Sequence, residues 1–371
     1  MKKIQIISFN VPYPSDYGGV IDVFYKIKAL KEAGIAVVLH CFDYGRGQSS
    51  VLEQLCETVF YYPRSKSFIH QFSKLPFIVK TRSSLTLIDN LNKFSDIPIL
   101  AEGLHCTFPL FSDKCINTSF YVRTHNIEHA YYGGLSKTES NFLKKKYFSI
   151  EASKLKRYES VLNKAKGICA ISPKDKEYFT ALNSNTILIS PFHPFQNINI
   201  NKGIGDFVLV HGDLSVSENI YSTRWLINEV FSKLNQKVVI AGKNPHHSII
   251  LLVQKHKNIQ LIANPSFDIM QRLIINAQVH IVHSFSPQGM KLKLLNVLYN
   301  GRHCICNEAI IQNTGLEHLC TVANDSESMI QLIVDLMQQP FDNANIRIRK
   351  DTLSLYSNEL QVEKLIKFLN L

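Results

Sequence analysis

The chain has 371 residues and a formal net charge of +11 at pH 7, and 45% of its residues are hydrophobic. This length favours two domains of about 150 to 200 residues over a single core. No run approaches the roughly 18 apolar residues of a spanning helix, and Met1 to Lys3 lead into a strand-like run without a cleavable signal pattern, so we expect a soluble, cytoplasmic protein.

The positive charge indicates a polyanionic neighbour: nucleic acid, an anionic bilayer or a phosphorylated substrate. No recognition motif for nucleic acid accompanies the charge, so we expect no nucleic-acid partner. The eight cysteines lie mostly in apolar runs without a CxxC pair or another metal-ligand spacing. Buried, reduced thiols are the better interpretation.

Short apolar runs rich in β-branched and aromatic residues alternate with helical intervals in the first half of the chain. They cover residues 4–9, 36–42, 58–62, 97–101, 119–123, 167–171 and 186–189. Strands that alternate with helices predict a parallel sheet with crossover helices.

The alternation restarts after a segment rich in Pro and Asn. The second series covers residues 206–210, 237–241, 258–262, 278–282 and 303–306, and a terminal helix is predicted over 358–371. We therefore predict an α/β protein with two doubly wound, Rossmann-like domains facing a cleft, and a ligand at the carboxyl ends of the strands. The predicted boundaries are 1–190 for the first domain, 191–205 for the linker, 206–350 for the second domain and 351–371 for the C-terminal helix.

The loop after the first predicted strand ends in the pair Gly18-Gly19, directly before a helix. Glycines at a strand-to-helix turn let backbone amides approach a ligand, although an ordinary turn is the alternative. Asp22 lies in the first turn of that helix and is a candidate base for an acceptor hydroxyl. The alternative is that it complements the helix dipole.

Polar residues follow the fourth and fifth predicted strands. His125 is the catalytic candidate, because a neutral imidazole can hydrogen-bond a sugar hydroxyl or act as a base. The residues assigned to the acceptor side of the predicted cleft are Glu102, His105, Asn126 and Glu128. His125 and His129 are close in sequence, but no third ligand matches them and the chain has no DxD motif, so catalysis is predicted to be independent of metal.

Residues 143–158, LKKKYFSIEASKLKRY, combine six cations with apolar residues. This pattern is typical of a basic amphipathic helix, which we predict to lie on an anionic membrane at the cytoplasmic face. The alternative is a solvated helix face with a few apolar residues packed on the core.

Residues 286–307, SPQGMKLKLLNVLYNGRHCICN, predict a helix that opens at Gly289, ends at Gly301 and leads into an apolar strand. The free N–H groups and the dipole at such a start favour a phosphate. Lys293 and Asn296 are three apart and therefore share one face. A solvated face of an amphipathic helix is the alternative.

This stretch resembles the donor-site helix of the family-4-like glycosyltransferases of the GT-B fold, whose usual run ends in Glu-Ala-x-Ala-x-Gly-x-Pro-Val. Gly301 and Ile305 match that ending, and Lys293 matches a lysine common in one branch. Gln288 and Asn296 stand where the two glutamates are expected. Both carboxylates are thus amides, which hydrogen-bond sugar hydroxyls without charge and cannot act as a base.

The resemblance implies roles for residues elsewhere. The pair Gly18-Gly19 would face the donor phosphates and the acceptor, and His125 would lie beside the donor sugar. The terminal helix would return to the first domain, and no catalytic metal or other cofactor would be bound.

The chain departs from the resembled family after the first strand of the second domain, which continues as His211-Gly212-Asp213-Leu214. The family has an arginine at the position of Asp213 and a lysine at that of Glu218, a pair that neutralises the diphosphate. Donor-binding residues are therefore expected at Gly212, Gln288, Gly289 and Asn296, with phosphate charge met by Lys243, Lys291 and Lys293.

The resulting prediction is a glycosyltransferase, in the first instance a hexosyltransferase, that moves a sugar from a nucleotide-sugar donor to a glycan or lipid-linked acceptor in cell-surface polysaccharide or glycoconjugate synthesis. Retention or inversion at the anomeric carbon stays open. Two alternatives remain: a degenerate protein of this fold acting as a non-catalytic partner subunit, and a hydrolysing nucleotide-sugar epimerase. A nicotinamide dehydrogenase is disfavoured because no GxGxxG follows the first strand.

Overall fold

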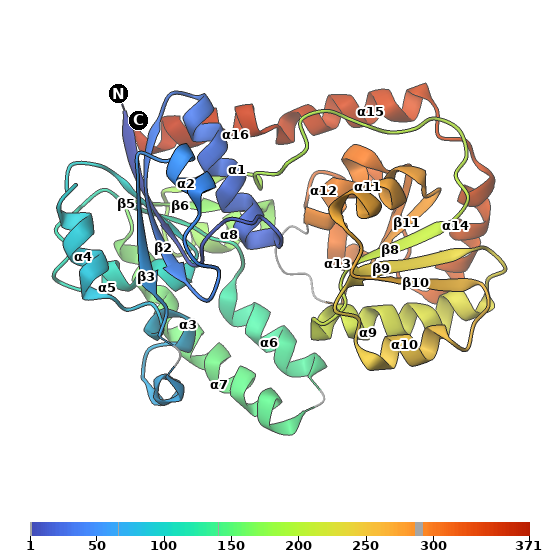
Figure 1. Cartoon of the computed structure of the whole chain (residues 1–371), viewed down its shortest axis with the longest axis horizontal. Coiled ribbons are helices and arrows are strands. Elements are labelled where there is room, and N and C mark those ends of the chain that lie inside the picture. The colour runs from blue at the N-terminus through green and yellow to red at the C-terminus, as the bar shows by residue number, and fades with distance from the viewer. Residues whose placement is uncertain (1, 66, 140, 286–291) are drawn as a thin grey trace. The chain divides into compact units, whose positions relative to one another are not determined.

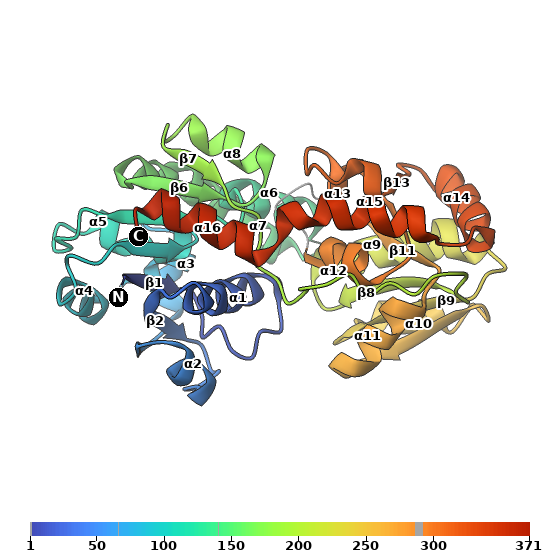
Figure 2. The same ribbon diagram turned by 90° about the horizontal axis from the view of Figure 1, so that it is seen from above.

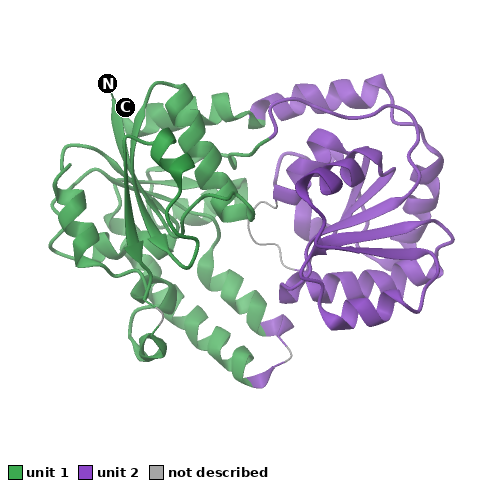
Figure 3. Ribbon diagram, in the orientation of Figure 1, with its two compact units in different colours: residues 1–136, 143–194, 356–371 green, residues 137–142, 195–355 purple. Residues whose placement is uncertain are grey.

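The computed structural model describes residues 2–65, 67–139, 141–285 and 292–371. The chain forms two compact units, each built on its own parallel sheet (Figure 1; Figure 3). Unit 1 comprises Met1–Ser136, Leu143–Pro194 and Tyr356–Leu371, and unit 2 comprises Lys137–Phe142 and Phe195–Leu355. Two parallel α/β sheets confirm the prediction of two doubly wound domains.

The described part of unit 1 contains a seven-stranded sheet with the order β3-β2-β1-β4-β5-β6-β7, in which all neighbours are parallel. Its strands are β1 (Lys3–Ser8), β2 (Ala36–Asp43), β3 (Thr58–Pro63), β4 (Ile99–Glu102), β5 (Phe120–Arg123), β6 (Gly167–Ala170) and β7 (Thr186–Leu188). Its helices are α1 (Gly18–Glu32), α2 (Ser50–Leu55), α3 (Phe77–Lys80), α4 (Leu85–Asn92), α5 (Phe108–Phe111), α6 (Glu128–Thr138), α7 (Phe142–Tyr158), α8 (Pro173–Thr180) and α16 (Asn358–Leu369).

Helices cover both faces of this sheet, and the alternation of side chains along β1 shows how the two cores divide. Ile4 and Ile6 pack with α1, α2 and α16, whereas Ile7 packs in the opposite core with α3, α4, α7 and α8. Figure 2 shows α16 alongside α1, with which it shares the first core. Because both faces are covered, most side chains of the central strands are apolar and buried.

The described part of unit 2 contains a six-stranded parallel sheet with the order β10-β9-β8-β11-β12-β13. Its strands are β8 (Val208–Asp213), β9 (Val238–Lys243), β10 (Ile259–Ala263), β11 (Val279–Val282), β12 (His303–Cys306) and β13 (Thr321–Val322). Its helices are α9 (Ser217–Trp225), α10 (His247–Val253), α11 (Phe267–Asn276), α12 (Leu292–Asn300), α13 (Glu308–Ile311), α14 (Ser326–Gln338) and α15 (Asn343–Leu353). A π-helical turn, Leu226–Val230, continues α9.

The core of unit 2 also lies on both faces of its sheet. One face packs against α9, α10 and α14, through buried residues such as Leu226, Ile249 and Ile333. The other face packs against α11 through Leu209, Val239 and Ile274. The two-residue strand β13 was not predicted, because so short a run carries no periodicity.

Each sheet reverses its strand order once, between β1 and β4 in unit 1 and between β8 and β11 in unit 2. Open α/β sheets bind ligands outside the carboxyl ends of the strands at this point. Asp22, Glu102 and His125 lie near this point in unit 1, and Gly212 and Lys293 lie near it in unit 2. No helix within the described ranges is both long and apolar enough to cross a membrane.

Candidate functional site

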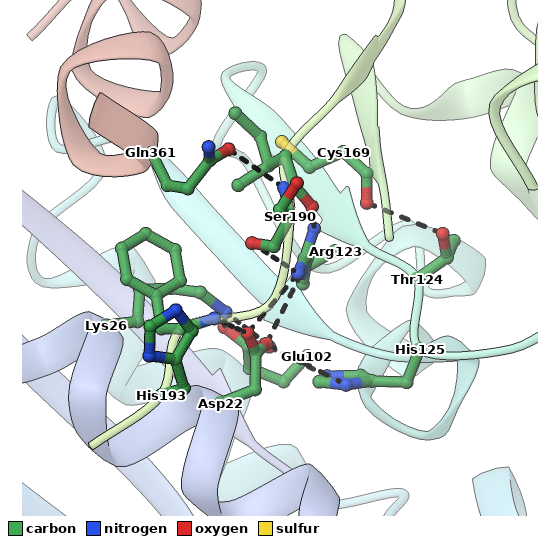
Figure 4. A network of polar contacts seen from close by, with 12 residues as sticks. Asp22, Lys26, Glu102, Arg123, Thr124, His125, Cys169, Ser190, His193 and Gln361 are labelled. Carbon is green, nitrogen blue, oxygen red and sulfur yellow. Dashed lines mark hydrogen bonds and ion pairs between the residues drawn. The ribbon is translucent and has the colours of Figure 1, made fainter. Parts of the chain in front are cut away.

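A buried network of charged side chains occupies the strand-order reversal of unit 1 (Figure 4). Asp22 and Lys26 lie one turn apart on α1, Glu102 ends β4, Arg123 ends β5 and His125 follows it. Lys26 Nζ lies 3.1 Å from Asp22 Oδ2 and 2.7 Å from Glu102 Oε1. The Nε and Nη2 atoms of Arg123 each donate to Asp22 at 3.3 Å.

Asp22 is held by more than these two cations. The backbone N–H of Phe192 also donates to it at 2.7 Å. Burial alone would raise the pKa of Asp22, but Arg123 and Lys26 outweigh burial and hold this pKa well below its usual range. A carboxylate with so low a pKa is a poor acceptor of protons, so this environment argues against Asp22 as a base and assigns it a positioning role.

Arg123 joins the network to the end of the chain. Its Nη atoms donate to the carbonyl oxygens of Ala170, Ile189 and Ser190, and the N–H of Ser190 donates to Gln361 Oε1 on α16. The network therefore fixes α1, β5 and α16 around the carboxyl edge of the sheet.

The oxygens and nitrogens of Asp22, Glu102 and His125 come within 4.8 Å of one another, a spacing that suits a metal ion. The side chains of Lys26 and Arg123 already supply two buried positive charges against the two carboxylates. A divalent cation added there would leave an uncompensated buried charge. The charge balance thus favours the observed ion pairs over a metal.

His125 is the member of the network that reaches the surface, with 10% of its side chain exposed. Its Nε2 lies 2.9 Å from Glu102 Oε2, and because a carboxylate only accepts, this contact places a proton on Nε2. The ring also packs edge-on against Phe9. Its other nitrogen, Nδ1, lies 3.8 Å from Asp22 Oδ2, so Glu102, Asp22 and Phe9 together fix the orientation of the imidazole.

Glu128 and His105 form a second polar pair in unit 1. Glu128 Oε1 and His105 Nδ1 are 3.9 Å apart, and neither buried atom has a hydrogen-bond partner. Burial raises the pKa of Glu128 to about 8, and Asn126 hydrogen-bonds to it. Burial also lowers the pKa of His105. At pH 7 His105 is therefore neutral and Glu128 is mostly protonated.

Glu128→Gln should stabilise the protein at pH 8 and leave it unchanged at pH 4. An unfolded Glu has a pKa near 4.3, so the folded state keeps a proton that the unfolded state loses. The stabilising contribution is complete below about pH 4.3 and is lost as the pH rises to about 8. Gln cannot ionise and avoids this loss.

Urea unfolding at a series of pH values measures the effect, with Glu53→Gln on exposed α2 as the matched control. A difference between Glu128→Gln and wild type that does not change with pH would contradict the assignment.

The glycine pair lies at the first turn of α1, as its sequence position suggested. A Cβ atom at Gly19 would lie 2.6 Å from Cζ of Phe9, so Gly19 makes room for the ring that packs on His125. Gly18 is the first residue of the helix. Their binding of donor phosphates stays a prediction.

Unit 2 has a small pocket at its own strand-order reversal. Gly212 at the end of β8, Asn219 on α9, His283 after β11 and Lys293 on α12 contribute to its lining. Lys293 Nζ lies 3.5 Å from Asn219 Oδ1. Burial lowers the pKa of His211 and of His283 to about 4, with the positive charge of Lys293 as the second cause. Among the described residues that line this pocket, Lys293 is thus the cation.

Asp213 at the end of β8 and Glu218 on α9, which stand where the resembled family has an arginine and a lysine, both accept hydrogen bonds within unit 2. Asp213 accepts from the N–H and the hydroxyl of Ser215 at 3.0 and 2.6 Å, which closes a local turn. Glu218 is buried and accepts from the Ser284 hydroxyl after β11. Asp213 is therefore engaged in a local turn, and Glu218 joins α9 to the segment that follows β11.

Of the other residues predicted to bind the donor in unit 2, the structure describes Asn296 and Lys243. Asn296 lies on the half-exposed face of α12 that it shares with Lys293, and its side chain accepts from Asn300 at 2.9 Å. Lys243 ends β9 and is exposed. Gln288, Gly289 and Lys291 lie outside the described residues.

No known protein-family profile matches the chain. A protein of Klebsiella pneumoniae named "Uncharacterized 44.6 kDa protein in cps region" is 26% identical over 361 residues, covering 90% of this chain and 91% of that protein. Its name states no activity.

Solved structures match the whole chain. A glycosyltransferase from Rickettsia africae has a TM-score of 0.65 at 15% identity, over 100% of this chain and 98% of that one. TarM of S. aureus, solved with UDP and alpha-GlcNAc-glycerol, has a TM-score of 0.69 at 11% identity, over 100% of both chains. The trehalose 6-phosphate synthase of Burkholderia multivorans reaches 0.67 at 11% identity, over 100% of this chain and 98% of that one.

The chain has the GT-B fold. This GT-B protein carries several site residues that sequence reasoning did not single out. They are Lys26 and Arg123 in unit 1 and Asn219, Ser222 and His283 in unit 2. The spacing of Asp22 and Lys26, four apart on a helix, was the one available signal. The others are brought to the site only by tertiary structure.

Proposed function

We propose that this protein is a glycosyltransferase that moves a sugar from a nucleotide-sugar donor to a glycan or lipid-linked acceptor. Unit 2 would hold the nucleotide diphosphate, and unit 1 would hold the acceptor. The GT-B fold and the Klebsiella relative in a cps region support a role in capsular or other cell-surface polysaccharide synthesis.

The observation that carries the proposal is the placement of Lys293. It is the cation of a pocket at the strand-order reversal of unit 2, beside Gly212 and Asn219. In the resembled family a diphosphate is neutralised by an Arg and a Lys whose positions are Asp213 and Glu218 here. Lys293 would supply the charge that these two positions lack, through a charge-assisted hydrogen bond.

In unit 1, His125 is the proposed catalytic residue. Glu102 would orient the imidazole and keep the proton on Nε2, while Asp22, Lys26 and Arg123 would hold the surrounding helix and strands in place. This arrangement contributes by positioning a polar group against the reacting sugar and by stabilising charge during transfer.

A panel of UDP, GDP, ADP and CMP sugars tests the proposal by thermal shift, followed by a release assay for the free nucleotide in the presence of acceptor extracts. Stabilisation by one nucleotide class together with acceptor-dependent release supports a transferase. Nucleotide binding without turnover would instead indicate a non-catalytic partner subunit, and release with formation of an epimerised sugar would indicate an epimerase.

Turnover should continue in excess EDTA at the rate measured with added Mg²⁺. The one described group with metal-ligand spacing, Asp22, Glu102 and His125, is already balanced by Lys26 and Arg123. Activity that EDTA abolishes and Mg²⁺ or Mn²⁺ restores would contradict metal independence.

We further propose that unit 1 docks on an anionic membrane through α7 and the neighbouring turn Phe68–Phe72. The turn exposes 66% of Phe68, 75% of Ile69 and 78% of Phe72, and Lys154 of α7 donates to the carbonyl of Gln71 at 2.6 Å. Apolar side chains beside a basic helix suit the boundary between headgroups and acyl chains.

Changing Lys144, Lys145 and Lys146 to Glu should reduce sedimentation with vesicles that contain anionic lipid, most strongly at low salt. All three lysines lie exposed on α7. The same exchange at Lys233, Lys237 and Lys255, exposed in unit 2, alters net charge equally and should have little effect. Equal losses in the two triple variants would show that net charge alone drives sedimentation.

A further inference from the structure

Two arginines at the carboxyl edge of the sheet in unit 1 have no acidic partner. Arg82 is only 5% exposed, and it donates to the carbonyl oxygens of Phe9 and Ile78 at 2.8 and 2.7 Å. Arg64 is half-buried, donates to Thr81 Oγ1 at 3.2 Å and lies over the Tyr44 ring at 4.3 Å. Within the described ranges, no ion pair includes either guanidinium.

The carboxyl group beside these two cations, Glu128, offers them little negative charge at neutral pH. Glu128 is the nearby carboxyl group, and burial raises its pKa to about 8, so it is neutral at pH 7. His105 is neutral as well, because burial and the two arginines lower its pKa. Arg64 is also the second cause, after burial, of a lowered pKa at Arg82. Two mutually repelling cations thus lie near each other, and neither forms an ion pair with a carboxylate of the described residues.

The same place contains buried polar atoms that lack partners. Oε1 of Glu128, a residue that is 4% exposed, and Nδ1 of His105 are each without a hydrogen bond, and they are 3.9 Å apart. Folded proteins rarely leave buried cations unpaired and buried polar atoms unsatisfied together. An anionic group with several oxygen atoms would satisfy both, since it offers charge to the arginines and hydrogen-bond acceptors to neutral Glu128.

We propose that Arg64, Arg82, His105 and Glu128 bind an anionic group on the acceptor, either a phosphate or a carboxylate. This inference rests on the proposed function and adds that the acceptor is acidic near the site of transfer. Arginine suits both oxyanions, because its planar fork binds two oxygens at once.

Isothermal titration calorimetry in the Lys293→Met variant tests the inference, since that variant removes the other proposed phosphate site. The probes are glucose 1-phosphate, glucuronate and neutral glucose. We expect at least one charged probe to bind more tightly than glucose. Preference for the phosphate or for the carboxylate identifies the source of the anion, and either result supports the site. Binding of both charged probes no tighter than that of glucose would overturn it.

Arg64→Gln, added to Lys293→Met, should weaken the charged probe about 10-fold or more. Arg64 is the preferred position because it is half-exposed, whereas buried Arg82 risks the fold. Arg46→Gln is the matched control, since Arg46 is paired with Asp16 at 2.8 Å. Glu128→Gln should retain binding, because it stays neutral.

Equal affinities in Lys293→Met with and without Arg64→Gln would refute the site. Nucleotide binding and turnover of the wild-type protein are measured separately. If they persist while charged probes fail to bind, this inference alone is wrong; if they are absent, the proposed function is wrong.

Discussion

Lys293→Met should bind nucleoside diphosphates about 10- to 150-fold more weakly than the wild-type protein, because one charge-assisted hydrogen bond contributes roughly 1.5 to 3 kcal/mol. Lys293 is half-exposed on α12, so its removal should leave folding nearly unchanged. Its ammonium group is the cation of the pocket that Gly212 and Asn219 line. Calorimetric titration with the nucleotide that stabilises the wild-type protein measures the change.

Two control variants separate this role from general charge. Lys350→Met removes an exposed cation from α15 and should bind nucleotide normally. Lys291→Met tests a second predicted donor-site lysine, two positions earlier in the sequence and outside the described residues. Unchanged affinity in Lys293→Met would refute the donor site in unit 2, and a loss confined to Lys291→Met would show that the wrong lysine was chosen.

Asp22→Asn should lower the free energy of unfolding by about 3 to 5 kcal/mol at pH 7, the usual cost of breaking a buried ion pair. The substitution leaves Lys26 and Arg123 with too little negative charge in a site that solvent does not reach. Urea unfolding measures the loss. Glu32→Gln is the matched control, because Glu32 forms an exposed pair with Lys28 on the same helix and should contribute less than about 1 kcal/mol.

The contribution of Asp22 to the free energy of unfolding should decrease at low pH. Its folded pKa lies below that of an unfolded Asp, near 3.9, so its stabilising contribution is present above about pH 4 and is lost as the pH falls below that value. The difference in the free energy of unfolding between the wild type and Asp22→Asn should therefore become smaller as the pH is lowered below about 4. If Asp22→Asn unfolded at pH 7 with the same free energy as the wild type, the buried charge network would not be needed for stability.

The fold could be predicted because its signal is local. Buried parallel strands are apolar throughout, and each of the twelve predicted runs overlaps a strand of the structure. Strand ends also place polar residues at one edge, which is why Glu102 and His125 were singled out and lie 2.9 Å apart. Such reasoning needs only the order of strands and helices.

The electrostatics of the site could not be predicted in the same way. Lys26 and Arg123 look like surface residues in a sequence, and only burial beside Asp22 and Glu102 turns them into counter-ions. Asp22 was a candidate base, with a role in complementing the helix dipole as the alternative, because its position in the first turn of α1 was known and its partners were not. The pKa of a carboxyl group depends on neighbours that are distant in sequence, such as Arg123.

The packing of α16 on unit 1 has a consequence for synthesis on the ribosome. Val362, Leu365 and Leu369 belong to the same core as Ile4 and Ile6, and Gln361 binds the backbone at Ser190. The first strands of unit 1 are therefore synthesised before unit 2, but α16, which completes their core, is synthesised after it. Nearly all of unit 2, by contrast, is one continuous stretch, Phe195–Leu355. Unit 2 should be able to fold first during translation, while unit 1 keeps an apolar groove open that a chaperone can cover.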